Sequence, residues 1–321
     1  MFNKSDSQRL AQPAAGGDAG GRRLLIIRNP TAGRRGGPFA GTVHRLRTLG
    51  CRIEMRETAA PGDAEAWARD AAAAGYDVVV AAGGDGTIRE VINGLADIPD
   101  APPLAILPLG TANVLAVEIG LSSDPAALAD TIAAGAGQPI CLGRIRGQTG
   151  RGTVFTAMAG VGFDAHVVAG VDLGLKRIFG KGAYVAEAFR QLVAYRFPRY
   201  RVVADGRAYE AASVIVANGR HYAGRYVCAP AAAIAEPLLH VCLFDSGGRL
   251  ATLRYMVALQ TGRLAARPDY RIVPARHVTI EAPAGEPVQA DGDIVAHLPV
   301  DIDVVPGALR LVMPPGGLAM R

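Results

Sequence analysis

The sequence has few aromatic residues and no long apolar run. Phe, Trp and Tyr account for only 6% of the 321 residues, and no basic motif is interleaved with aromatics. A nucleic-acid binder, which the pI of about 9.2 alone would suggest, therefore has no further support, and no nucleic-acid partner is expected. No stretch of about 18 uninterrupted apolar residues occurs, so we expect no transmembrane helix.

Cysteines are also scarce. The four of them, Cys51, Cys141, Cys228 and Cys242, are far apart, and none forms a CxxC pair. This spacing argues against a zinc site or a disulfide framework and favours buried, reduced thiols in a reducing, cytoplasmic compartment. Residues 1–21 are polar and rich in Gly and Ala, without the apolar run of a signal peptide, so we predict a disordered tail.

What the sequence does contain is typical of a globular protein rich in turns. Half of the residues are hydrophobic, a fifth are charged, and there are 40 glycines and 21 prolines. Such a composition supports a sizeable core and excludes wholesale disorder. The net charge of +5 favours an anionic partner, and charge alone leaves a nucleotide, a nucleic acid and acidic lipid headgroups open.

In the first half of the chain, short apolar runs alternate with helix-forming segments. Strands are predicted at residues 24–28, 51–58, 77–82 and 104–107, and helices at 39–49, 63–74, from 87 onward and at 111–118. Asp63 is the predicted N-cap of the second of these helices. The alternating order, with strands apolar on both faces, predicts a parallel sheet covered by helices.

Beyond residue 142 the pattern changes to short β-prone segments separated by turns. One helix, near residues 184–195, interrupts them. This pattern predicts an antiparallel, sandwich-like second domain. We therefore predict an α/β domain at residues 22–142, which residues 304–315 can rejoin, and a β-sandwich domain at residues 143–303.

Three glycine-rich segments follow apolar strands, at residues 29–33, 83–87 and 108–113. Glycines let a backbone approach an anion and present its N–H groups, and the start of the next helix adds the positive end of its dipole. Because ligands of such sheets sit where loops leave the carboxyl ends of the strands, we expect all three segments to converge at one edge. They predict a phosphate-binding site; the alternative is a set of ordinary strand-to-helix turns.

The second segment carries an acid, Asp85. An isolated carboxylate in a phosphate cradle would repel the ligand, so Asp85 is predicted to hold a divalent cation or to face the attacking hydroxyl. The segment is not a Walker loop, and it is not a dinucleotide fingerprint, because Arg89 stands in the place of the third glycine.

In order, spacing and flanking strands, the three segments resemble the signatures of the diacylglycerol kinase catalytic-domain family. The family includes diacylglycerol, sphingosine and ceramide kinases and soluble bacterial lipid kinases, and is distantly related to NAD kinases. The resemblance covers residues 24–313 and implies a nucleotide-binding α/β domain, a β-sandwich and an active site between them. It also implies an enzyme that uses ATP and Mg²⁺ to phosphorylate a lipid hydroxyl at a membrane surface.

By this resemblance, ATP contacts the three segments, the end of the second strand and the helix after the second segment. The implied residues are Asn29, Pro30, Thr31, Ala32, Gly33, Thr58, Gly83, Gly84, Asp85, Gly86, Thr87, Glu90, Gly110, Thr111 and Asn113. Asp85 is also the implied ligand of a catalytic Mg²⁺. For Thr58 the alternative is an ordinary threonine at a strand end.

The implied general base is Asp293, at the end of residues 289–293. The family usually has Glu at this place, and aspartate is shorter by about 1.5 Å, the length of one C–C bond. A carboxylate there can accept the proton of the acceptor hydroxyl, whereas the alternative is a glycine turn between two strands. Around Glu236 the chain also lacks the Asp-Gly-x-Leu segment that the family associates with a structural magnesium, so that metal site is not carried over.

Two further segments concern the lipid. Asp164 is a candidate contact of the lipid headgroup, or part of a strand-end turn. Residues 176–184 mix cations with apolar residues and are expected either to contact an anionic membrane surface peripherally or to form a solvated helix entry. An NAD kinase-like enzyme and a non-catalytic nucleotide-binding regulator are the alternative functions. The motifs leave open which lipid, diacylglycerol, sphingoid base or ceramide, is phosphorylated, and they leave the oligomeric state open.

Overall fold

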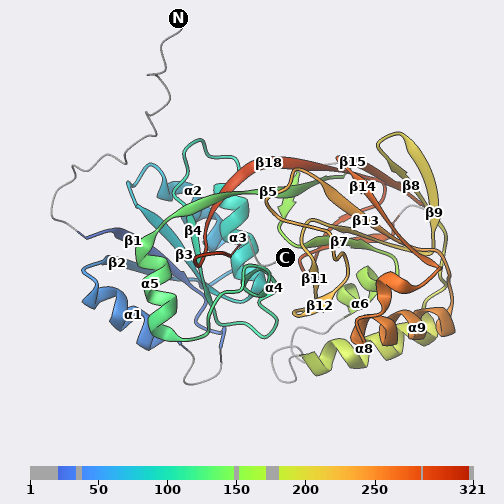
Figure 1. The fold of residues 1–321 in the computed structure, drawn as a ribbon, viewed down its shortest axis with the longest axis horizontal. Coiled ribbons are helices and arrows are strands. Elements are labelled where there is room, and N and C mark those ends of the chain that lie inside the picture. Colours follow the sequence, from blue (N-terminus) through green and yellow to red (C-terminus); the bar gives the residue numbers. More distant parts are fainter. Residues whose placement is uncertain (1–20, 34–37, 148–151, 171–180, 283–284, 318–321) are drawn as a thin grey trace, which may run out of the picture.

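The computed structural model describes residues 21–33, 38–147, 152–170, 181–282 and 285–317 (Figure 1). The predicted N-terminal tail lies outside the described residues as far as residue 20. Residues 176–180 of the predicted membrane-contacting segment lie outside them as well.

The first half of the described chain alternates between strands and helices. Its elements are β1 (Arg23–Arg28), α1 (Phe39–Thr48), β2 (Arg52–Glu57), α2 (Asp63–Ala71), β3 (Val78–Gly83), α3 (Asp85–Leu95), β4 (Leu104–Pro108), α4 (Val114–Glu118) and α5 (Pro125–Ala134). The strands pair in parallel in the order β2-β1-β3-β4. The predicted parallel α/β arrangement is confirmed.

Helices cover both faces of this sheet because β1, β3 and β4 are apolar on both sides. Leu25 and Ile27 of β1 belong to a core with α2 and α3, whereas Leu24 and Ile26 belong to a second core with α1 and α5. All four side chains are fully buried. Burying a side chain of this size contributes roughly 1.5–3 kcal/mol, so these two layers hold the strands, and with them the loops at the strand ends, in fixed positions.

The second half of the chain is dominated by antiparallel strands. Its elements are β5 (Gly137–Arg146), β6 (Thr153–Phe155), β7 (Met158–Val161), α6 (Phe163–Gly170), α8 (Lys181–Ala194), β8 (Tyr200–Ala204), β9 (Arg207–Ala211), β10 (Ser213–Ala217), β11 (His221–Tyr222), β12 (Tyr226–Val227), β13 (Leu239–Phe244), α9 (Arg249–Gln260), a 3-10 helix (Leu264–Ala266), β14 (Tyr270–Ala275), β15 (His277–Glu281), β16 (Pro287–Ala290), β17 (Asp293–His297) and β18 (Val300–Val312). Six of these strands form an antiparallel sheet in the order β14-β13-β10-β7-β16-β17.

This antiparallel sheet packs face to face on strands of the first sheet. One buried cluster joins Val214 and Val241 of the antiparallel sheet to Val278 and Ile302 of β15 and β18. On the opposite face of the antiparallel sheet, α9 contributes Tyr255 to a second buried cluster. The predicted β-sandwich is therefore confirmed.

The long strand β18 connects the two halves of the molecule. It pairs in antiparallel fashion with β5 and β15, and near its end Leu311 pairs in parallel with Leu104 of β4. The first sheet therefore continues from the α/β half into the sandwich as ten strands. Figure 1 shows β5 and β18 running together from one half to the other, so that hydrogen-bonded strands fix the two halves relative to each other.

Several helix starts differ from the predictions. The N-cap of α2 is Gly62, and the carboxylate of Asp63 instead accepts hydrogen bonds from two preceding backbone N–H groups. Helix α3 already begins at Asp85. Helix α4 begins only at Val114, because the preceding Asn113 has a left-handed backbone that no helix can include.

The cysteines were predicted to be buried thiols, and this holds for three of the four. All four cysteines are unpaired, and three of them are buried, but Cys51 is only half-buried. In the described part of the chain, no helix is both long enough and apolar enough to cross a membrane.

Candidate active site

Three loops meet at one edge of the parallel sheet. They are loop 1 (residues 29–33) after β1, loop 2 (residues 83–87) at the end of β3 and loop 3 (residues 108–113) at the end of β4. Loops 2 and 3 touch through their backbones, since a Cβ atom on Gly110 would lie 2.5 Å from the Cα of Gly84. Loop 1 lies against loop 3, since a Cβ on Gly33 would lie 3.4 Å from the carbonyl oxygen of Leu109. The structure thus brings the three glycine-rich segments together.

Side-chain hydrogen bonds shape loop 1. The Oδ1 atom of Asn29 accepts hydrogen bonds from the backbone N–H of Thr31 at 2.9 Å and from its hydroxyl at 2.8 Å. The Nδ2 group of Asn29 donates to Oγ1 of Thr87 at 3.4 Å and so joins loop 1 to loop 2. A Cβ on Gly83 would lie 2.5 Å from that Oγ1 atom, so loop 2 needs a glycine at this position.

The other predicted nucleotide contacts lie around the same edge. The N–H of Thr58 donates to the carbonyl of Arg28, directly before loop 1. Glu90, on α3, accepts a hydrogen bond from the N–H of Gly62 at 3.1 Å and so reaches the segment between β2 and α2. Thr111 is exposed in loop 3. The remaining predicted residues, Pro30, Ala32 and Gly86, lie in loops 1 and 2.

Asp85 begins α3 and anchors loop 3. Its Oδ2 accepts the N–H of Asn113 at 2.9 Å, and its Oδ1 accepts the N–H of Val114 at 2.7 Å. The side chain of Asn113 closes loop 3 by accepting the N–H of Gly110 at 2.9 Å and donating to its carbonyl at 2.8 Å. The Asp85 carboxylate thus satisfies backbone donors at the start of α4, a structural role that the sequence did not predict.

Asp293 lies beside loop 2. A Cβ on Gly86 would be 3.7 Å from the Oδ2 atom of Asp293. The same oxygen accepts a hydrogen bond from Nε of Arg89 at 3.2 Å and forms an ion pair with the terminal nitrogen of that guanidinium at 3.1 Å. The side chain of Asp293 is 38% exposed. Both predicted catalytic acids, Asp85 and Asp293, therefore lie at loop 2.

Asp291 holds the turn that presents Asp293. Its carboxylate accepts hydrogen bonds at 2.7–3.0 Å from the Thr156 hydroxyl and from the backbone N–H groups of residues 156–158. Burial raises the pKa of Asp291, and these hydrogen bonds act in the opposite direction. The turn is thereby fixed to the break between β6 and β7.

A second acid, the half-buried Asp164, lies on the sandwich side of the site. Its Oδ2 accepts a hydrogen bond from Nε2 of Gln289 at 2.7 Å, and its Oδ1 accepts one from the hydroxyl of Tyr222. Burial raises the pKa of Asp164, and both hydrogen bonds act against that rise. Because Gln289 also accepts the N–H of Gly292 at 3.0 Å, one side chain connects Asp164 to the turn that bears Asp293.

An ion pair joins α4 to the sandwich half. The carboxylate of Glu118 forms a hydrogen bond with Nδ1 of His221 at 2.6 Å and accepts the backbone N–H groups of Arg220 and His221 at 3.0–3.1 Å. The Glu118 side chain is only 7% exposed. Since the start of α4 is held by Asp85, this ion pair links loop 2 to the strand that carries Tyr222.

Comparison with known proteins matches this arrangement along nearly the whole chain. A family model described as the diacylglycerol kinase catalytic domain matches residues 23–145, and one described as the YegS C-terminal NAD kinase beta sandwich-like domain matches residues 157–313. The "Probable lipid kinase YegS-like" of Pseudomonas aeruginosa is 33% identical over 309 residues, which cover 93% of this chain and 96% of that protein. The chain belongs to the diacylglycerol kinase catalytic-domain family.

Further relatives of this family are similar over the same span. A "Diacylglycerol kinase" of Mycobacterium tuberculosis is 31% identical over 303 residues, covering 92% of this chain and 96% of that protein. The crystal structure of a diacylglycerol kinase from Bacillus anthracis has a TM-score of 0.75 at 25% identity, covering 94% of this chain and 99% of that one. The predicted family and the predicted enzyme class, a lipid kinase, are confirmed.

The carboxylates at this site fit an Mg²⁺ ion that is held partly by nucleotide phosphates. They fit an ion held by protein ligands alone less well. Among the described residues, no three His, Cys, Asp or Glu side chains lie close enough together to hold an ion. Mg²⁺ is commonly bound by one or two carboxylates together with substrate phosphates. Each Asp85 oxygen accepts one N–H and keeps a second lone pair, so Asp85 fits as the protein ligand.

Three residues of the site were not predicted from the sequence. The glycine pattern gives Arg89 no role of its own, and no motif in the sequence points to Glu118 or His221. Their partners are remote in the chain, 204 residues away for the Arg89–Asp293 pair and 103 residues away for Glu118–His221. Neither residue type nor local spacing could have revealed these pairs.

We expect Gly110→Ala to weaken ATP binding strongly. The new Cβ would lie 2.5 Å from the Gly84 backbone, and backbone cannot move aside as a flexible side chain can. Forcing a methyl group into such a contact costs about 1–3 kcal/mol, here by separating loops 2 and 3. Titration of ATP by calorimetry measures the effect. Gly147→Ala is the control, because a Cβ on Gly147 would meet only the Cβ of Ala296, at an ordinary distance of 3.7 Å. Unchanged ATP affinity in Gly110→Ala would contradict the close contact of the loops.

Glu118 should make the stability of the protein depend on pH in the acid range. Burial alone would raise its pKa, but hydrogen bonds from His221 and the Arg220 amide and the charge of His221 lower the pKa below its ordinary value of 4.5. An acid whose pKa is lowered by folding stabilises the fold above its ordinary pKa, and that contribution is lost as the pH falls from there to the lowered pKa.

Glu118→Gln is therefore expected to lose about 1–3 kcal/mol of unfolding free energy at pH 7, because an amide group replaces one acceptor oxygen among buried donors. Urea unfolding at pH 7 and below pH 4.5 measures this, and the difference from the native protein should shrink at the lower pH. Asp70→Asn, which removes the charge of an exposed acid, serves as the control. An equal difference at both pH values would mean that the Glu118 charge contributes nothing.

Proposed function

We propose that this protein transfers the γ-phosphoryl group of ATP to a hydroxyl of a membrane lipid, with Mg²⁺ as cofactor. Diacylglycerol, a sphingoid base and ceramide are the candidate acceptors, and the names of the relatives favour diacylglycerol. The observation that carries the proposal is the contact of the three glycine-rich loops with one another and of loop 2 with Asp293. These contacts place the backbone N–H donors of the loops next to the carboxylate of Asp293.

The loops receive the phosphates. Loop 2 offers glycine N–H groups and leads directly into α3, an 11-residue helix whose positive dipole end favours anions. The hydroxyl of Thr111, which is exposed in loop 3, and further N–H groups of loops 1 and 3 complete the donors. Asp85 would hold Mg²⁺ together with the phosphates, and the ion would neutralise part of their charge.

Asp293 accepts the proton of the lipid hydroxyl as the lipid oxygen bonds to the γ-phosphorus and the bond from that phosphorus to the bridging oxygen breaks, so that ADP leaves. The guanidinium of Arg89 donates to the Oδ2 atom of Asp293, whereas within the described residues the Oδ1 atom has no hydrogen-bond partner. We assign the proton to Oδ1. Arg89 extends from α3 and holds the acid next to loop 2, which offsets the methylene that aspartate lacks relative to the usual glutamate.

The two parts of the chain divide the substrates between them. We assign the nucleotide to residues 22–142 together with 304–315, in keeping with the pairing of Leu311 and Leu104. We assign the lipid to residues 143–303, with Asp164 at its headgroup. The enzyme then works in the cytoplasm and contacts the membrane peripherally.

Incubation with labelled ATP and separate samples of diacylglycerol, sphingosine, ceramide and NAD tests the proposal. We expect label in a lipid and none in NAD. Label in NAD alone would instead identify an NAD kinase-like enzyme. Binding of ATP without transfer to any of the four acceptors would identify a non-catalytic nucleotide-binding protein.

A further inference from the structure

Exposed apolar side chains gather on two neighbouring helices of the sandwich half. Seven large apolar side chains are exposed in the described part of the chain, and five of them lie on α8 and α9. These five are Phe189 (60% exposed), Val193 (64%), Leu250 (59%), Leu253 (42%) and Val257 (52%). We call them the α8–α9 face. A soluble protein rarely gathers so many exposed apolar residues in one place without a binding partner for them.

The spacing of these residues makes the face continuous. Phe189 and Val193 are four residues apart on α8, and Leu250, Leu253 and Val257 are three and four apart on α9, so each set lies on one side of its helix. The two helices lie side by side (Figure 1), and the guanidinium of Arg249 donates to the carbonyl of Val193 at 2.7 Å.

Helix α9 is apolar on its inner side as well. Tyr255 and Ala258 are buried against the antiparallel sheet. Helix α9 thus carries apolar side chains on its outer side as well as on its inner side, beside Arg249 and Arg254, whereas a surface helix typically confines them to the side that faces the core. The outer side of α9 therefore needs cover that the described residues of the chain do not provide.

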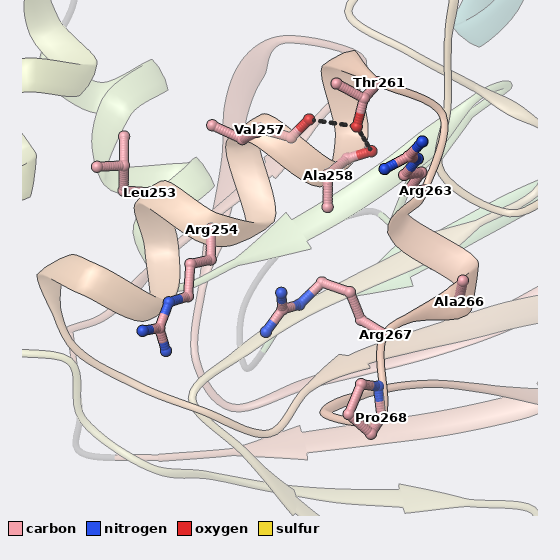
Figure 2. Close-up of a pocket in the computed structure, with 9 residues that line it drawn as sticks. All are labelled: Leu253, Arg254, Val257, Ala258, Thr261, Arg263, Ala266, Arg267 and Pro268. Atoms are coloured by element: carbon pink, nitrogen blue, oxygen red, sulfur yellow. Dashed lines mark hydrogen bonds between the residues drawn. The ribbon is translucent and has the colours of Figure 1, made fainter.

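Positive charge surrounds the apolar residues. The sequence from residue 249 to residue 268 contains four arginines and no acid. Beside α9 there is a hollow of about 610 Å³, lined by Leu253 and Val257 together with Arg254, Arg263 and Arg267. Figure 2 shows Arg254 projecting from α9, and Arg263 and Arg267 projecting from the segment that follows it.

The three arginines that line this hollow differ in their partners within the described part of the chain. Arg267 is neutralised by Asp269, with both hydrogen bonds at 2.9 Å, and lies over the ring of Tyr255. By contrast, the guanidinium groups of Arg254 and Arg263 meet no acid among the residues that the structure describes. Cations next to exposed apolar side chains match the two layers of a bilayer surface, anionic headgroups above acyl chains.

We propose that the α8–α9 face, with Arg254 and Arg263, docks the protein on a bilayer that contains anionic lipids. This inference rests on the proposed function and names the surface by which the enzyme reaches its lipid. Helix α8 contacts α6, which carries Asp164, so docking here brings the bilayer to the part of the chain assigned to the lipid. A second copy of the chain fits less well, because a symmetric contact would set the same uncompensated arginines against each other.

Vesicle sedimentation without ATP tests the docking directly. The probes are vesicles of phosphatidylcholine alone and vesicles with added phosphatidylglycerol. The charge variant is Arg254→Gln with Arg263→Gln, and the apolar variant is Leu253→Ser with Val257→Ser. The matched control, Arg47→Gln with Leu49→Ser, removes an exposed arginine and a 40%-exposed leucine from α1 and its C-cap in the other half.

We expect the native protein and the control to bind the anionic vesicles equally. The charge variant should bind them about 30-fold more weakly, since each arginine near an anionic surface contributes about fivefold. The apolar variant should bind at least about tenfold more weakly. Binding of both variants at the native level, or no binding of the native protein to anionic vesicles, would overturn the docking surface.

Two further measurements separate this inference from the proposed function. With a short-chain, water-soluble diacylglycerol and no vesicles, both variants should turn over as the native protein does, because their residues lie outside the loops and acids of the active site. If no lipid is phosphorylated but the variants still lose vesicle binding, the proposed function fails and the docking surface stands. Analytical ultracentrifugation without vesicles measures the oligomeric state. If the variants change that state while their vesicle binding is unchanged, the α8–α9 face is an interface between copies and the inference fails.

Discussion

Replacing Asp293 with asparagine is expected to lower kcat by about 10²–10⁴-fold, the usual contribution of a general base. Asparagine keeps the size of the side chain but cannot take up the proton of the acceptor hydroxyl. The KM for ATP should change little, because the phosphates are held by loops 1–3. The free energy of unfolding should also change little. The Asp293 side chain is 38% exposed, and the change weakens a partly exposed ion pair with Arg89, which contributes little to stability. Initial-rate kinetics with the preferred lipid, together with thermal unfolding, measure these effects.

Asp293→Glu is the matched comparison for this prediction. It retains the charge and restores the residue that the family usually has, so it should stay within about tenfold of the native rate, whereas a misplaced base typically costs more. Because Arg89 holds the native acid next to loop 2, the added methylene requires a small shift of the guanidinium. A native rate in Asp293→Asn would exclude Asp293 as the base. Residues 289–293 would then be only a turn between two strands.

The α/β half of the fold was predictable from the sequence because its signals are local. Strands β1, β3 and β4 are contiguous apolar runs buried on both faces, and most of the turns in this half carry glycine. Helix α9 was not predicted, because it is apolar both on its buried side and on the α8–α9 face, which removes the polar–apolar periodicity of a surface helix. Strand β5 was not predicted either. It begins with Gly137, and its long pairing with β18, a partner distant in the chain, decides its structure.

The candidate site shows the same contrast between local sequence signals, which were predictable, and contacts between distant segments, which were not. The glycine-rich loops could be placed at one edge of the sheet from the strand order alone. What the sequence could not give was the set of contacts between loops and acids: Glu118 with His221, Arg89 with Asp293, and Asp85 with the start of α4. Each joins elements whose proximity only the folded chain establishes.

Asp85→Asn is expected to impair both turnover and stability. Asparagine keeps one oxygen, but its NH₂ group must face one of the two backbone N–H groups, of Asn113 or Val114, that the carboxylate accepts. An unmade hydrogen bond at such a place costs about 1–3 kcal/mol. Turnover should fall by more than about 10²-fold, because loop 3 loosens and the phosphates lose the carboxylate that we assign to Mg²⁺.

Comparison with Asp293→Asn separates the two roles of Asp85. Both changes remove one negative charge from the neighbourhood of loop 2, but only Asp85 holds backbone donors. A lowered unfolding midpoint in Asp85→Asn alone, together with weaker ATP binding, would match its place at the start of α4. Native stability in Asp85→Asn would contradict the anchoring of loop 3, and native turnover at limiting Mg²⁺ would exclude Asp85 as a metal ligand. Since anchoring acts without ligand and metal binding requires it, unfolding with and without Mg²⁺-ATP assigns the loss to one role or to both.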